Sequence, residues 1–144
     1  MIRSILIATD GSDTAKRAVE AGARLAKEID ATVHVITAYK PIRTAKIAGA
    51  GPEATDWHIP SDSKADAVLA DACAVLRLHG IEAEPHAREG DPADAILDAA
   101  EESGSDLIVL GNQGMTGSKR FMLGNVPNRV SHHAGCSVMI VRTD

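Results

Sequence analysis

Residues 106–141 read DLIVLGNQGMTGSKRFMLGNVPNRVSHHAGCSVMIV, and this stretch decides the interpretation of the fold. A short apolar run, 107–110, leads directly into a loop that contains Gly111, Gly114, Gly117 and Gly124. Glycine tolerates positive φ and lets a ligand approach N–H groups that a Cβ would shield. A helix after such a loop directs further N–H groups and its positive dipole end toward an anion. The stretch therefore indicates a buried strand that leads into a phosphate-binding loop.

Charge supports this interpretation. The formal net charge of the chain is -5, yet residues 107–143 contain no Asp or Glu. The basic residues of this segment are Lys119, Arg120, Arg129 and Arg142. A local basic segment in an acidic molecule is a candidate anion site. The simpler alternative is a glycine-rich turn with solvated Lys and Arg side chains.

Two common phosphate motifs do not match the loop. A P-loop requires Gly-Lys-Ser/Thr, but Gly117 is followed by Ser118 and only then by Lys119. The G-x-G-x-x-G fingerprint of dinucleotide-binding folds is also absent. What remains is Gly111, two residues, Gly114, nine residues, Gly124 and then Asn125.

Composition limits the class of protein. The 144 residues are 44% hydrophobic and 24% charged, which predicts one globular domain spanning 1–144. Tyr39, Trp57 and Phe121 are the only aromatic residues, too few to stack the bases of single-stranded nucleic acid. The acidic balance also disfavours a phosphodiester backbone. We therefore expect no nucleic-acid partner.

Metal sites and membrane segments are not indicated. Cys73 and Cys136 are far apart and lack a CxxC spacing. His132 and His133 are adjacent on an expected helix and project about 100° apart, which is poor geometry for one metal. We expect no metal ligands. The N-terminal apolar run is too short for a signal peptide, and no run is long enough to span a bilayer, so we expect a cytoplasmic protein without a membrane partner.

Hydrophobic periodicity predicts alternating strands and helices. The expected strands are 5–9, 32–38, 81–87, 107–110 and 138–141, and the expected helices are 13–29, 61–78, 92–103 and 126–134. The fold class is therefore α/β, a doubly wound five-stranded parallel sheet with helices on both faces. The strand with Pro85 should lie at an edge, because proline cannot donate to a ladder. In such sheets ligands bind beyond the carboxyl ends of the strands.

The segment from Tyr39 to Pro60 is unusually long for a connection in a compact domain. It contains Trp57 and His58. A lid over a ligand and a variable solvated excursion are equally compatible with its sequence.

The chain resembles the universal stress protein family over nearly its whole length. The matching pieces are IRSILIATDGSDTAKRAVEAGARLA, GDPADAILDAAEESGSDLIVLGNQG and MLGNVPNRVSHHAGCSVMIVRT, together with the glycine pattern above. The resemblance implies a Rossmann-like sheet of the adenine nucleotide alpha hydrolase type, with strand order 3-2-1-4-5. It also implies a sensor or regulator in the stress response that binds an adenine nucleotide, ATP, with or without Mg²⁺. One departure is Asn125, where the nucleotide-binding branch has Ser or Thr; an amide also donates to a phosphate oxygen.

The resemblance assigns roles to nine positions. Those expected on the adenine and ribose side are Ala8, Thr9, Asp10 and, through its backbone, Ala38; those expected at the phosphates are Gly111, Gly114, Gly124, Asn125 and Val126. The Asp10 carboxylate suits a ribose hydroxyl or a bound Mg²⁺. Its structural alternative is a bond to its own backbone two residues on.

Three alternative functions stay open. No nucleophile elbow or other catalytic set is recognised, so hydrolysis of ATP would be slow and would depend on positioning and charge. A dimeric scaffold without nucleotide is the second alternative, and a binder of cyclic AMP or AMP is the third. The apolar strand Val138–Val141 is expected at a sheet edge, where pairing with a second copy would give a homodimer, as the family commonly forms. A protein partner is expected, but its identity is not indicated.

Overall fold

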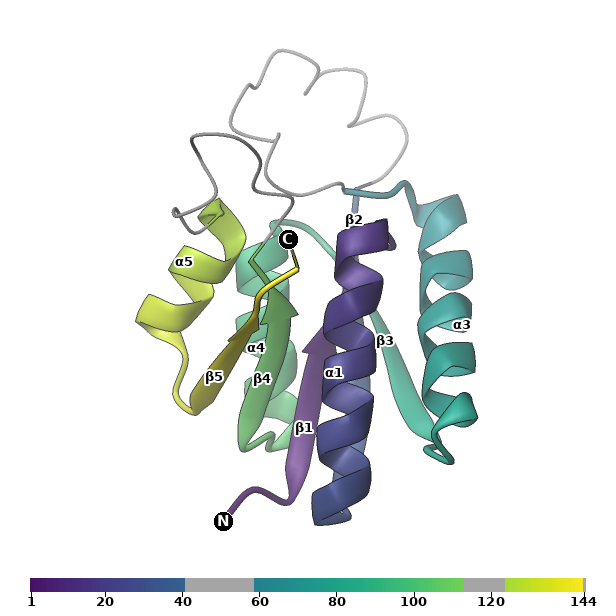
Figure 1. The fold of residues 1–144 in the computed structure, drawn as a ribbon. Helices are drawn as coiled ribbons and strands as arrows, with labels where there is room; N and C mark the ends of the chain where they lie inside the picture. The colour runs from purple at the N-terminus through teal and green to yellow at the C-terminus, as the bar shows by residue number, and fades with distance from the viewer. Residues whose placement is uncertain (41–58, 113–123, 144) are drawn as a thin grey trace.

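The computed structural model describes residues 1–40, 59–112 and 124–143. These residues form one parallel sheet of five strands in the order β3-β2-β1-β4-β5, with helices on both faces (Figure 1). The strands are β1 (Ser4–Ala8), β2 (Thr32–Tyr39), β3 (Ala83–Glu89), β4 (Leu107–Gly111) and β5 (Ser137–Val141). The helices are α1 (Asp13–Ile29), α3 (Asp62–Leu78), α4 (Pro92–Ser103) and α5 (Asn125–His133). The fold class and the strand order expected from the sequence are both confirmed.

The sheet separates two apolar cores. Along β1, Ile5 and Ile7 point to the core under α1 and α3, while Leu6 and Ala8 point to the core under α4 and α5. All four are at most 1% exposed. Because both faces of this central strand are covered, its sequence is continuously apolar and does not alternate.

The helix boundaries follow local signals in the sequence. Ser12 caps α1, where its Oγ accepts a hydrogen bond from the Ala15 N–H at 3.2 Å. Asp91 caps α4 by accepting from the Asp94 N–H at 3.0 Å, and Pro92 occupies the first turn. Gly104 ends α4 at φ 65°, a conformation that glycine adopts without steric cost. None of the helices in the described ranges is long and apolar enough to cross a membrane.

Strand β3 starts and ends two residues later than its expected range of 81–87. Ile81 does not join the sheet because its N–H donates to the Leu76 carbonyl at the end of α3. At the other end, β3 continues to Glu89 because β2 supplies pairing partners up to Tyr39. The strand does lie at a sheet edge, as Pro85 indicated. Along this edge, burial lowers the pKa of His86, and the nearby His34 lowers it further.

The start of the chain is held to the start of β4 by Asp106. Its Oδ2 accepts hydrogen bonds from the Arg3 N–H at 2.9 Å and the Ser4 N–H at 3.1 Å. These two bonds, aided by the positive charges of the N-terminus and Arg3, hold the pKa of the Asp106 carboxyl below its usual value. The ionised carboxylate therefore stabilises the folded state.

We expect Asp106→Asn to lower stability at neutral pH, and this loss to depend on pH. Because the folded-state pKa lies below the unfolded-state pKa, the carboxylate stabilises the fold above about pH 4 and ceases to do so as pH falls through the folded-state pKa. Urea unfolding of both proteins between pH 7 and pH 3 measures the effect. The difference should be constant from pH 7 to about pH 5 and should then shrink. A difference that grows as the solution is acidified would contradict the assignment.

Candidate functional site

The carboxyl ends of the parallel strands meet at one edge of the sheet, and the predicted site lies there (Figure 1). Strands β1 and β4 are neighbours, with Ile7 aligned to Val109. This register brings the residues after β1 beside the end of β4. Asp10 therefore lies next to the start of the glycine loop, which the sequence by itself could not establish.

The turn after β1 is tightly constrained. The Thr9 Oγ1 accepts a hydrogen bond from the Gly11 N–H at 3.1 Å, and the Asp10 Oδ1 accepts one from the Ser12 N–H at 2.9 Å. Gly11 has φ 82°, and a Cβ there would lie 2.9 Å from the Val68 side chain of α3. Asp10 thus makes the local backbone bond considered as its structural role. That bond also fixes the direction of a carboxylate at the strand end.

A buried hydrogen-bond network lies at the end of β4, and it was not predicted from the sequence. Asn112, 7% exposed, accepts through Oδ1 from the Thr143 hydroxyl at 2.8 Å and from the Thr143 N–H at 3.2 Å. The Asn112 N–H donates to the Val141 carbonyl, and Arg17 donates to the Thr143 carbonyl. Asn112 is therefore held to β5 and to Thr143, and Thr143 is in turn held to α1 by Arg17. Little in the sequence indicated this network, because Asn112 and Thr143 are 31 residues apart and carry no local motif.

The phosphate side of the site is described only in part. Gly111 ends β4, Gly124 precedes α5 as its N-cap, Asn125 is exposed and Val126 is buried. The first N–H groups of a helix lack partners within the helix, and the helix dipole favours an anion near them. Gly114 lies outside the described residues, as do Lys119 and Arg120.

Among the described residues, Arg129 does not offer the free positive charge that the sequence indicated. Arg129 donates to the Asp91 carboxylate at 2.9 Å and to the Asp94 carboxylate at 3.3 Å, both at the start of α4. Its charge is therefore compensated by two carboxylates and serves to hold α5 against α4. Counting basic residues along the chain could not reveal this, because the partners lie 35 and 38 residues away.

The end of β2 brings in the expected base-pocket position. Ala38 is 1% exposed. Just beyond it, Lys40 forms an isolated parallel β-bridge with Ser61, and the Lys40 backbone N–H donates to the Pro60 carbonyl at 3.0 Å. The two ends of the long connection are therefore held together beside the carboxyl edge. Residues 41–58, for which a lid was one of the two interpretations, lie outside the described ranges.

A separate groove of about 550 Å³ lies at the other end of the sheet. Its lining includes Ser105 before β4 and Cys136 before β5, so it opens near the amino ends of these strands. Burial, and to a smaller degree the Asp106 carboxylate, raises the pKa of the Cys136 thiol and so disfavours the reactive thiolate. This groove is distinct from the predicted nucleotide site.

A protein family and several known proteins are similar to this chain over nearly its whole length. The model of the universal stress protein family matches residues 1–142. The universal stress protein YxiE of Bacillus subtilis is 34% identical over 148 residues, covering 99% of this chain and 100% of that protein. A universal stress protein of Methanocaldococcus jannaschii is 32% identical over 145 residues, covering 99% of this chain and 83% of that protein.

Two solved structures are similar over almost the whole chain. One is a universal stress protein in complex with cAMP, with a TM-score of 0.77, 28% identity, and coverage of 99% of this chain and 98% of that one. The other is the universal stress protein of Archaeoglobus fulgidus in complex with dAMP, with a TM-score of 0.70, 26% identity, and coverage of 97% and 98%. The chain belongs to the universal stress protein family.

Proposed function

We propose that this protein binds an adenine nucleotide, ATP in the first instance, at the carboxyl edge of β1, β2 and β4. The observation that carries the proposal is the parallel pairing of β1 with β4, which places Asp10 beside the start of the glycine loop. Two similar proteins that were solved with cAMP and dAMP support the class of ligand. The residues proposed to contact it are Ala8, Thr9, Asp10, Ala38, Gly111, Gly114, Gly124, Asn125 and Val126.

Each part of the site has chemistry that suits one part of the nucleotide. Asp10 would accept hydrogen bonds from the ribose hydroxyls, or bind Mg²⁺ where the ion accompanies ATP. The start of α5 would provide N–H groups and its dipole to the phosphates. The Asn125 amide would donate to a phosphate oxygen in place of the hydroxyl found in relatives.

We propose that the bound nucleotide changes a contact with a protein partner in a cytoplasmic stress response. Cyclic AMP is the second candidate ligand, because a similar protein was solved with it and because Asn125 replaces the usual hydroxyl. A slow ATP hydrolase is the other alternative: ATP bound at the same site would be hydrolysed and its phosphate released.

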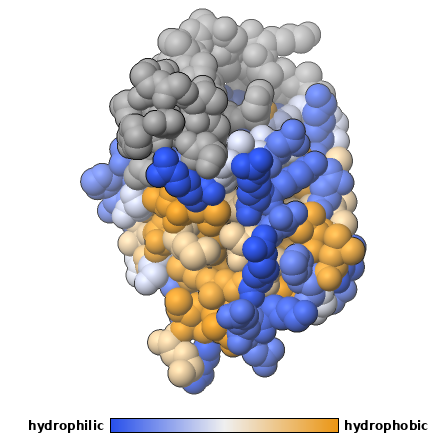
Figure 2. All heavy atoms as spheres, in the orientation of Figure 1, coloured by the Kyte–Doolittle hydropathy of each residue, from blue (hydrophilic) through white to orange (hydrophobic). Residues whose placement is uncertain are grey.

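We further propose a homodimer that forms through Val138–Val141. Strand β5 is a sheet edge, and all four of its apolar residues are only partly buried. Val138 and Ile140 pack against the core under α4 and α5, and on the opposite face Met139 and Val141 pack against the core under α1 and α3. Figure 2 shows apolar atoms gathered on this face, over the region of β5 and β4 in Figure 1. Pairing with a second copy would cover the edge.

Mass spectrometry of the nucleotide released from freshly purified protein tests the proposed function. We expect one adenine nucleotide per chain, and its mass distinguishes ATP, AMP and cyclic AMP. Calorimetric titration of the stripped protein with each of the three provides the affinities. Protein that carries no nucleotide and binds none of the three would contradict the proposal and favour the scaffold alternative. Release of phosphate from bound ATP would favour the hydrolase.

A further inference from the structure

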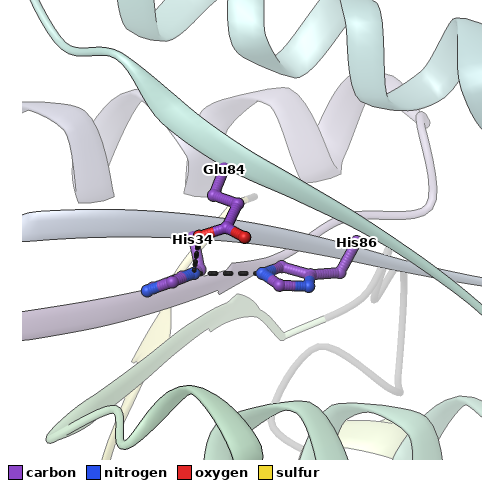
Figure 3. A group of neighbouring side chains, drawn as sticks. All are labelled: His34, Glu84 and His86. Atoms are coloured by element: carbon purple, nitrogen blue, oxygen red, sulfur yellow. Dashed lines mark hydrogen bonds and ion pairs between the residues drawn. The ribbon is translucent and has the colours of Figure 1, made fainter.

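Three polar side chains converge on one face of the sheet, where β2 pairs with the outer strand β3 (Figure 3). His34 belongs to β2, and Glu84 and His86 belong to β3. The His34 Nδ1 lies 3.0 Å from the His86 Nε2 and 3.5 Å from the Glu84 Oε2. One ligand atom from each of the three residues lies within 4.8 Å of the others.

The register of the two strands brings these residues together. His34 is aligned with Glu84, and Ile36 is aligned with His86. Because alternate residues of a strand share a face, all three side chains stand on the face of Ile36, which packs in the core under α4. Helix α4 packs chiefly against β2 and only lightly against β3. Because α4 leaves β3 largely uncovered, polar side chains on this face of β3 remain accessible to water.

The distances are close to those of a metal centre. In a tetrahedral zinc site with bonds of about 2.0–2.2 Å, neighbouring ligand atoms are roughly 3.3 Å apart. The distances from the His34 Nδ1 to the His86 Nε2, 3.0 Å, and to the Glu84 Oε2, 3.5 Å, lie on either side of this value. The Glu84 side chain is 68% exposed, so it can rotate toward an ion, whereas the His34 side chain is held at 12% exposure.

The kind of ligand selects the kind of metal. Two imidazole nitrogens and one carboxylate oxygen form a three-residue set that zinc uses when its fourth position holds water. Imidazole disfavours Mg²⁺ and Ca²⁺, which prefer oxygen ligands. The nearest cation on the same strand, Arg88, is paired with Glu102 of α4, so its charge is compensated.

We propose that His34, Glu84 and His86 bind one Zn²⁺ ion, which joins β2 to β3. The ion replaces the hydrogen bond between the two imidazoles and leaves one position open to water. His34 precedes Ala38 by four residues, roughly 13 Å along a strand. The zinc site is therefore separate from the proposed nucleotide site, and either can exist without the other.

The test titrates metal-free protein with Zn²⁺ against a chromophoric chelator and with Co²⁺ as a spectroscopic probe. We expect one ion per chain and the intense visible absorption of four-coordinate Co²⁺. Each of His34→Gln, Glu84→Gln and His86→Gln should weaken Zn²⁺ at least about tenfold, since even changes next to the ligands cost that much in known sites. The matched control changes both His132 and His133 to Gln on exposed positions of α5, and it should bind as the unchanged protein does.

A second measurement needs no variant. In the unchanged protein, Zn²⁺ should shift the ring ¹⁵N resonances of His34 and His86 and leave those of His132 and His133 in place. Three results would overturn the proposal. They are no stoichiometric binding of Zn²⁺ to the unchanged protein, binding of Zn²⁺ by the three variants as tight as by the unchanged protein, or loss of binding in the α5 control. In the first case the cluster is a hydrogen-bonded histidine pair beside a solvated carboxylate.

Discussion

Gly22→Ala is expected to lower the free energy of unfolding by about 2 kcal/mol, as overpacking of a core usually does. The added Cβ would lie 2.6 Å from the Ile7 Cδ1 and 3.0 Å from the Ile7 Cγ1, in the core between α1 and the sheet. Elsewhere in a helix, glycine to alanine raises stability by up to about 1 kcal/mol. Helix propensity and packing therefore have opposite signs, and we expect packing to dominate because Ile7 is fully buried. Urea unfolding measures the change.

A double-mutant cycle isolates the contact. Ile7→Val removes the Cδ1 atom that the new methyl group would meet, at a cost of roughly 1 kcal/mol. In that background Gly22→Ala should cost much less, or should stabilise through helix propensity. A coupling energy of at least about 1 kcal/mol is expected for two residues in such contact. Purely additive effects would show that α1 does not approach β1 as closely as described.

Asp10→Asn is expected to weaken adenine nucleotide binding by about tenfold or more. A hydrogen bond to a charged group contributes roughly 1.5–3 kcal/mol, and each 1.4 kcal/mol corresponds to a factor of ten in affinity. Asparagine keeps the oxygen that accepts from the Ser12 N–H, so the turn after β1 should persist. Calorimetric titration of the stripped protein with ATP measures the loss.

Two further variants separate binding from folding. Asp10→Ala also removes the bond to Ser12, so it should lose about 1 kcal/mol of stability in addition to affinity. Asp13→Asn removes an exposed carboxylate at the start of α1 and should leave affinity nearly unchanged. If Asp10→Asn binds ATP as tightly as the unchanged protein does, Asp10 has only its turn-forming role.

The architecture was accessible from the sequence because its signals are local. The apolar run over residues 5–9 indicated a strand covered on both sides, and the helices expected over 13–29 and 92–103 begin and end where the structure has them. Pro85 placed β3 at an edge. The strand order came from the family resemblance, since which strands become neighbours depends on packing across the whole chain.

The contacts that shape the candidate site were less accessible, because they join distant positions. Asn112 meets Thr143, and Arg129 meets Asp91, through side chains that carry no local motif. The cluster formed by His34, Glu84 and His86 was partly within reach, because Glu84 and His86 are two residues apart in an expected strand and so share a face. Only the pairing register shows that His34 stands opposite them. A search for metal ligands by spacing within one segment does not detect ligands shared between strands.

The nucleotide site at the carboxyl edge is tested most directly by a titration of ¹⁵N-labelled, nucleotide-free protein with ATP, followed by backbone amide chemical shifts. The account predicts saturable shifts at Thr9, Asp10, Gly124 and Val126, and none at Glu84 or at the groove beside Cys136. Saturable shifts confined to that groove, or no saturable shift at the four named residues, would contradict it.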